Sequence, residues 1–484
     1  MAPALAADFS SWLGNPERSD CVVRISVPRG SAEPSSSSKR RCAAAQRVRE
    51  IPAHLIILQQ AEYVKCRMNP CWSKEEPGVF ELQLDDESEV EAAELLLRML
   101  YSTADVGAPL RGAAAAADGD APPPPQATLL RVMLLADRLQ AALCATAAAH
   151  ELAQRPALEW ETVLAVYHLP PACADNPALA PLLAAAATGL VERLGDLDAA
   201  WLDPARAAEL LALPFAAVAA LVGDARTAAS ENTVFYTCDA WLAQHGGGEP
   251  EQQAALAAAL RAPHLTPLYL AGVAGASDWL SRHISARELL GAAAFAAAHD
   301  VCRQRMLAKP AHPAARRAAW REPPRPESPA AKALHIAWNV PVSELQALHE
   351  RAELEGVAHL PSPPSVWQGL RWDLRLHAAR REGGVLVGVY VFAHLPPGCC
   401  EEAFVSASVK VEAAHLSRGF TVMPFSLGSP SACGLGTSEG RGFADAFGLG
   451  AGLRAGWDEA AWRAAGLVGE RGSVSVRATI RDVA

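Results

Sequence analysis

The spacing of apolar residues changes twice along this chain of 484 residues, and each spacing suits a different kind of secondary structure. Residues 20–145 combine short β-branched runs with apolar helical stretches, whereas residues 146–308 contain one alanine-rich helical stretch after another. Beyond residue 333, apolar and polar residues alternate as they do in half-buried strands. The sequence therefore predicts a multidomain protein with an α+β domain, an all-α helical bundle and an antiparallel β-sandwich (333–484).

Local patterns support each part of this division. In the first domain, Phe80 and Leu82 alternate with polar residues as in a strand, and residues 92–101 (AAELLLRMLY) fit an apolar helix. In the second, Ser285 and Glu288 have the spacing of a capping box at a helix start. In the third, the alternation at residues 371–377 (RWDLRLH) predicts a strand.

Three low-complexity stretches interrupt these patterns. Residues 28–49 are rich in serine and basic residues, and residues 107–127 contain four consecutive prolines, so both are predicted to be insertions in the first domain. Residues 309–332 are rich in proline and arginine and are predicted to link the helical bundle to the β-sandwich. Residues 1–19 form an N-terminal segment before the first domain.

Composition excludes several classes of partner. The formal net charge of −10, without a long basic block, argues against nucleic acid or an anionic membrane surface. The sequence has no obvious window of about 18 strongly apolar residues. Its eleven cysteines include no CxxC pair, which predicts reduced thiols and argues against a zinc site. No metal or cofactor is expected. The expected location is cytoplasmic, nuclear or both.

The first domain resembles a BTB (POZ) domain. The resemblance depends on Asp20 before the opening strand, on His54 in the sequence IPAHL (51–55), and on Tyr101 at the end of an apolar helix. It implies a structural role for these three residues. His54 is expected to order the turn from strand to helix by hydrogen bonding rather than to act in catalysis or metal binding.

The second and third domains resemble the domains that follow BTB in plant and algal adaptor proteins. The helical segment is similar to a BACK domain, with the signature residues Ser230, Glu231, Asn232, Phe235 and Trp241. The last domain resembles a TRAF-like (MATH-type) β-sandwich. Its candidate substrate-domain residues are Trp367, Trp372 and Phe420, which either line a recognition groove or belong to the core, with the core favoured.

The resemblance implies a non-catalytic function. BTB–BACK proteins with a third recognition domain act as substrate adaptors of cullin-3 RING ubiquitin ligases, so the expected partners are cullin-3, a second copy of the chain through BTB, and an unidentified protein substrate. No enzymatic activity is expected of such an adaptor. The alternative is a BTB-mediated interaction scaffold that does not bind cullin.

A cullin contact is expected just before the strand that contains Phe80. Related domains carry a hydrophobic-x-Glu motif there, which places Trp72 at the hydrophobic position and Lys74 where glutamate is expected. A shift of one residue would instead place Glu75 at the acidic position. Trp72 is either an apolar anchor for cullin or an ordinary surface or core tryptophan.

Overall fold

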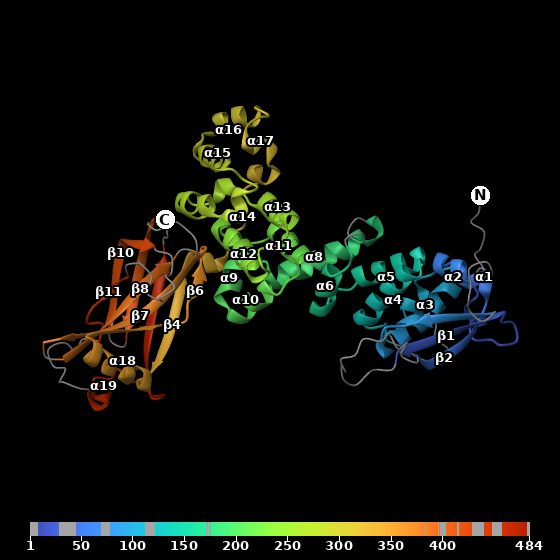
Figure 1. Ribbon diagram of the computed structural model, residues 1–484, viewed down its shortest axis with the longest axis horizontal. Coiled ribbons are helices and arrows are strands. Elements are labelled where there is room, and N and C mark those ends of the chain that lie inside the picture. Colours follow the sequence, from blue (N-terminus) through green and yellow to red (C-terminus); the bar gives the residue numbers. More distant parts are fainter. Residues whose placement is uncertain are drawn as a thin grey trace, which may run out of the picture. The chain divides into compact units, whose positions relative to one another are not determined.

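The computed structural model describes most of the chain, and it combines helices with largely antiparallel sheets, as predicted for a multidomain α+β protein (Figure 1). The described residues are 8–28, 45–68, 78–111, 122–170, 173, 176–382, 384–394, 396, 403–413, 416–427, 440–447 and 457–481. They form two compact units, residues 1–190 and residues 191–484. The boundaries of the three predicted domains stay predictions.

The first unit contains a three-stranded sheet in the order β2-β1-β3. Its strands are β2 (Ala45–Ala53), β1 (Cys21–Pro28) and β3 (Val79–Gln83). Strand β1 pairs with β2 in the antiparallel sense and with β3 in the parallel sense. Apolar residues alternate as predicted, since Phe80 and Leu82 of β3 are buried between more exposed neighbours.

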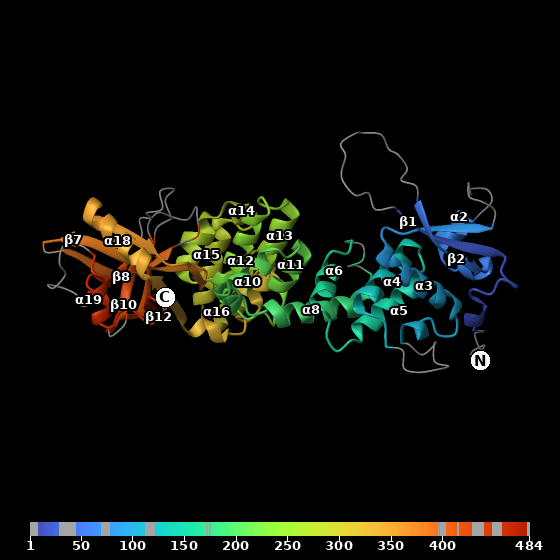
Figure 2. The same ribbon diagram turned by 90° about the horizontal axis from the view of Figure 1, so that it is seen from below.

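Seven α-helices accompany this sheet among the described residues. They are α1 (Leu55–Leu58), α2 (Glu62–Arg67), α3 (Val90–Tyr101), α4 (Gln126–Arg138), α5 (Ala142–Ala153), α6 (Trp160–Tyr167) and α8 (Ala180–Leu194), the last of which runs on into the second unit. Helices α3 and α4 lie on one side of the β1–β2 pair in both views (Figures 1 and 2). The predicted apolar helix at 92–101 is the larger part of α3, whose leucines are mostly buried.

Parts of both predicted insertions belong to regular secondary structure. Residues 45–49 belong to β2, where they pair with β1 and where Arg49 forms an ion pair with Glu94 of α3. Ala108–Arg111 forms a 3-10 helix (η3) with Leu110 buried. Strand pairing satisfies the backbone groups of a stretch that composition alone had indicated to be solvated. Residues 29–44 and 112–121 lie outside the described residues.

The helical part of the second unit begins after α8. Its α-helices are α9 (Leu197–Leu202), α10 (Pro204–Leu211), α11 (Phe215–Gly223), α12 (Glu231–Gln244), α13 (Pro250–Ala259), α14 (Asp278–Ser281), α15 (Ala286–Ala297), α16 (Asp300–Leu307) and α17 (Pro313–Arg316). The predicted capping box is present at the start of α15, where the Ser285 and Glu288 side chains each accept a backbone N–H of the other residue.

Two sheets follow in the second unit. The strands of the first, in the order β10-β9-β12-β4, are β10 (Leu416–Leu427), β9 (Ala403–Ala413), β12 (Ser473–Arg481) and β4 (Leu334–Pro341). The strands of the second, in the order β11-β8-β7-β5 with β6 also on β7, are β11 (Arg441–Phe443), β8 (Gly384–His394), β7 (Leu370–Arg381), β5 (Val357–Pro361) and β6 (Ser365–Trp367). Helices α18 (Val342–Glu355) and α19 (Glu459–Ala464) accompany them. In β7 the predicted alternation is present, with Trp372, Leu374 and Leu376 buried.

One segment of the described chain, Pro177–Leu194, is long and apolar enough to cross a membrane by length and composition, with a mean hydropathy of 1.2. Helices α10 and α11 pass the same test only if they are taken together across a bend of 113°. This segment was not expected from the sequence, and its leucines contribute more to the hydropathy than its alanines. Its buried residues Leu182, Ala186 and Leu190 recur every fourth position, so one face of the helix packs against protein.

Candidate functional site

Three residues that the sequence analysis grouped as structural meet at the entry to α1. The Leu55 backbone N–H donates to Asp20 Oδ1 at 2.7 Å, and the His54 backbone N–H donates to the Tyr101 hydroxyl at 2.6 Å. His54 Nδ1 lies 3.1 Å from the same hydroxyl. Tyr101 is fully buried, and burial raises its pKa to about 12, so it stays a neutral hydrogen-bonding group. The arrangement fixes the turn from β2 into α1.

The residues expected to contact cullin, Trp72, Lys74 and Glu75, lie outside the described residues. The helix before them carries an exposed aromatic residue, Tyr63, whose backbone N–H donates to the Leu139 carbonyl between α4 and α5. Large apolar side chains are exposed on the elements around this contact, at Ile56, Leu134 and Leu143.

The five residues predicted to be a BACK signature all lie at or within α12. Ser230 caps the helix, and its side chain accepts the Thr233 backbone N–H at 3.1 Å. Asn232 exchanges hydrogen bonds with Thr266, which lies on the chain beyond α13. Trp241 is buried and donates to the Leu213 carbonyl at 2.9 Å. These contacts bind α12 to the segments on either side of it in the sequence.

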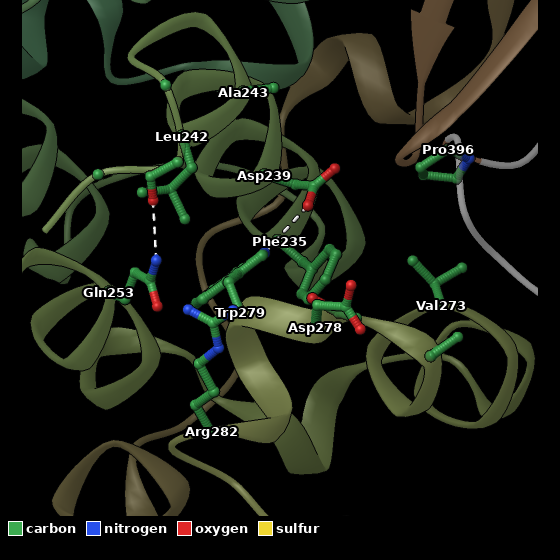
Figure 3. A pocket seen from close by; sticks show the side chains of 15 residues that line it. Phe235, Asp239, Leu242, Ala243, Gln253, Val273, Asp278, Trp279, Arg282 and Pro396 are labelled. Atoms are coloured by element: carbon green, nitrogen blue, oxygen red, sulfur yellow. Dashed lines mark hydrogen bonds between the residues drawn. The ribbon is translucent and has the colours of Figure 1, made fainter. Parts of the chain in front are cut away.

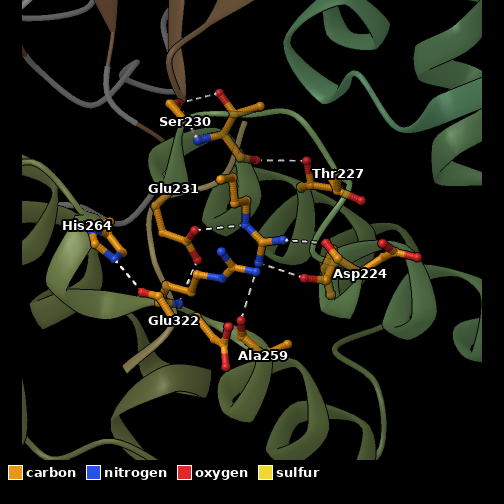
Figure 4. A network of polar contacts seen from close by, with 12 residues as sticks. Asp224, Thr227, Ser230, Glu231, Ala259, His264 and Glu322 are labelled. Carbon is orange, nitrogen blue, oxygen red and sulfur yellow. Dashed lines mark hydrogen bonds and ion pairs between the residues drawn. The ribbon is translucent and has the colours of Figure 1, made fainter. Parts of the chain in front are cut away.

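Glu231 lies in a buried ionic network (Figure 4). Arg325 Nε is 2.9 Å from Glu231 Oε2, and each side chain is 1% exposed. The Arg325 guanidinium also donates to the Val222 carbonyl at 2.7 Å, while the Arg261 backbone N–H donates to Glu231 Oε1 at 2.7 Å. The predicted linker 309–332 is therefore fixed to the helices at Arg325.

The hairpin between β6 and β7 joins the second sheet to the helices. Its two turn residues, Gln368 and Gly369, have φ values of 51° and 74°, which lie in the left-handed region. The Tyr269 hydroxyl donates to the Gly369 carbonyl at 2.8 Å, and a Cβ on Gly369 would lie 2.8 Å from the Asn232 carbonyl oxygen. The absence of a side chain at Gly369 allows this close approach.

The two tryptophans predicted for the substrate domain are buried beside this hairpin. Trp367 is 1% exposed and donates from Nε1 to the Ala330 carbonyl at 3.0 Å. Trp372 is fully buried, and its indole donates to the Trp367 carbonyl. Of the two alternatives for these residues, the structure places both in the interior. The Phe420 side chain lies outside the described part of the structure.

Strands β7 and β8 carry a charge network that the sequence analysis missed. Asp373 Oδ1 lies 2.6 Å from His394 Nε2, and Arg375 Nε donates to Asp373 Oδ2 at 2.7 Å. The Arg375 guanidinium lies over the Phe392 ring, 4.1 Å from its centroid. All these side chains point to the same face of the sheet, a relationship that depends on the register of β7 against β8.

A pocket of about 500 Å³ lies between α12, α13 and α14 (Figure 3). Phe235 and Trp279 form an aromatic pair in its wall, with ring centroids 5.6 Å apart and planes 26° apart. Asp239 Oδ1 accepts the Trp279 indole N–H at 3.0 Å, and burial raises the pKa of Asp239. Val273 and Pro396 border the other side. Among the lining residues the sequence had indicated only Phe235.

No metal site is evident among the described residues, since no group of three or more His, Cys, Asp or Glu side chains could hold an ion there. The chain matches no protein-family model, and no curated protein is significantly similar to it.

Proposed function

We propose that this protein is a non-catalytic substrate adaptor of a cullin-3 RING ubiquitin ligase. In this proposal residues 20–145 act as a BTB domain that dimerises and binds cullin-3, residues 146–308 act as a BACK domain, and the C-terminal β-sandwich binds a target protein in the cytoplasm or nucleus. The observation that carries the proposal is the meeting of the three residues of the BTB resemblance at one turn, where Tyr101 accepts the His54 N–H in a buried hydrogen bond and Asp20 accepts the N–H of the next residue, Leu55.

The second unit supports the proposal through the attachment of its sheets. An adaptor has to hold its target at a defined position, and the Tyr269–Gly369 hydrogen bond joins the helices to the second sheet. The burial of Trp367 and Trp372 in the same region favours a structural role for both. The target is then bound by other residues of the C-terminal domain.

The exposed apolar residues of the first unit also favour a partner surface. Ile56 is 76% exposed and Leu143 is 72% exposed, so both side chains are accessible to a partner. Trp72 would add a larger apolar anchor, since tryptophan is enriched among the residues that dominate binding energy.

Calorimetric titration of the full chain with the N-terminal domain of cullin-3 tests the proposal. We expect sub-micromolar binding by the wild-type chain, with Trp72→Ala weakening it at least about 10-fold, the loss typical of an interface anchor. Leu290→Ala, which removes an exposed apolar side chain from the second unit, is the matched control and leaves binding unchanged. Lys74→Glu strengthens binding if the acidic position is residue 74.

The alternative function is a BTB-mediated scaffold that does not bind cullin. Lysine at position 74, where the cullin-binding motif has glutamate, favours this alternative. A folded, dimeric sample that gives no heat with cullin-3 supports the scaffold and overturns the adaptor.

A further inference from the structure

The pocket beside α12 contains a carboxylate that lacks a cationic partner. Asp239 is half-buried, and burial raises its pKa. Only the hydrogen bond from Trp279 opposes this rise. None of the ion pairs formed by the described residues includes this carboxylate. Removing a negative charge from water without a counter-charge is costly, so a cation that entered the pocket would be bound favourably.

A second acceptor in the pocket wall lacks a donor. Gln253 is 5% exposed, and its Nε2 donates to the Gly247 carbonyl at 2.9 Å, but its Oε1 has no hydrogen-bond partner. Figure 3 shows Asp239 and Gln253 on different sides of the pocket with Trp279 between them. A buried acceptor without a donor is unfavourable, so Gln253 adds an uncompensated partial negative charge to the wall of the pocket.

The rest of the lining sets the charge and shape of the ligand. Asp239, Asp278 and Arg282 together give the pocket a net charge of −1. The stacked rings of Phe235 and Trp279 offer an aromatic wall, which attracts a cation and also packs well against methylene groups. A ligand with one positive charge on an apolar stem would satisfy both features.

We propose that this pocket binds a protonated primary amine on an aliphatic stem, the chemistry of a lysine side chain. The ammonium group donates an N–H bond to Asp239, and the stem lies against Trp279. Arg282 also lines the pocket and disfavours a second positive charge there, so a diamine binds no better than a monoamine.

Matched probes test the chemistry on the full chain. Binding of Nα-acetyl-lysine amide, of its Nε-acetylated form and of n-pentylamine is measured by tryptophan fluorescence and by saturation-transfer NMR. We expect the lysine probe to bind and the Nε-acetylated probe, which has lost its charge, to bind at least about 10-fold more weakly. Equal binding by n-pentylamine identifies a free amine as sufficient, whereas binding of the lysine probe alone identifies a lysine within a peptide.

Two variants locate the site. Asp239→Asn keeps an acceptor for the Trp279 indole but removes the charge, so we expect at least about 10-fold weaker binding of the lysine probe without loss of folded structure. Asp300→Asn, in the exposed first turn of α16, is the matched control and leaves binding unchanged. The proposal is overturned if no amine probe binds, if the charged and acetylated probes bind equally, or if folded Asp239→Asn binds like the wild-type chain.

Discussion

Arg325 and Glu231 form a fully buried ion pair across 94 residues of sequence, with 2.9 Å between Nε and Oε2. The pair fixes the proline- and arginine-rich segment after the helices to the first turn of α12. Its remaining polar atoms are satisfied by backbone groups, including the Val222 carbonyl and the Arg261 N–H. Loss of either partner destabilises the fold, because the remaining charge would be buried without compensation.

Replacement of Arg325 by methionine is therefore expected to be strongly destabilising. It leaves Glu231 buried without its cation, which lowers the free energy of unfolding by about 3–5 kcal/mol. Chemical denaturation of the full chain measures the loss. The control is Arg193→Met, which breaks the exposed pair with Glu209 and costs no more than about 1 kcal/mol. Equal losses in the two variants would contradict a dominant role for the buried pair.

Gly369→Ala is expected to weaken the attachment of the second sheet to the helices. The new Cβ would lie 2.7 Å from the Tyr269 hydroxyl and 2.8 Å from the Asn232 carbonyl oxygen, at a residue whose φ is already 74°. Gly472→Ala has a similar φ of 68° but meets no atom within 4 Å, so it reports the backbone strain alone, about 1–2 kcal/mol. Thermal unfolding should show a larger drop in melting temperature for Gly369→Ala than for Gly472→Ala. Equal drops would show that the contacts with Tyr269 and Asn232 add nothing to the cost of the substitution.

Stability should depend on pH through Asp198. This carboxyl is fully buried, and burial raises its pKa from 3.8 to about 6, despite hydrogen bonds from Thr233 and the Ser230 backbone. Between these two values the folded state holds more protons than the unfolded state, so the contribution of Asp198 to stability falls as the pH rises from 3.8 to about 6. The total change is about 3 kcal/mol.

Urea denaturation over this pH range measures the effect. Asp198→Asn cannot titrate, so its difference in stability from the wild-type chain should change across the window. Asp300→Asn, which removes an exposed carboxylate, should give a difference that is nearly independent of pH. A constant difference for Asp198→Asn would contradict the raised pKa.

Tyr101→Phe should destabilise the turn into α1. It removes the acceptor of the His54 N–H, and a buried donor without an acceptor costs about 1–3 kcal/mol. Tyr63→Phe is the control, since that hydroxyl makes an exposed contact with Arg67, and the change should cost well under 1 kcal/mol. Denaturation of the two variants compares the costs, and equally small effects would show that the turn does not depend on Tyr101.

Features within a few residues of one another were predicted well. The capping box of Ser285 and Glu288 is present, because a capped first turn involves only neighbouring residues. The alternation in β7 was also predicted, except at Asp373. Its polar character indicated an exposed position, but His394 on the next strand pairs with it and allows it to be buried.

The prediction that residues 28–49 form a solvated insertion was wrong for the last five residues, for a related reason. Residues 45–49 look solvated by composition, but pairing with β1 and the Arg49–Glu94 contact make them a strand. Composition describes a stretch by itself, whereas strand pairing depends on a partner elsewhere in the chain.

The sequence by itself determined the periods of the helices and strands, the helix caps and the order of α+β, helical and β-rich parts, because these depend on side chains that are close along the chain. Only the tertiary structure decided that Arg325 meets Glu231, that the Gly369 turn fits against Tyr269, and that Asp239, Gln253 and Trp279 surround one pocket. These contacts join residues on different elements, and their energies depend on burial and on a close fit that folding alone creates.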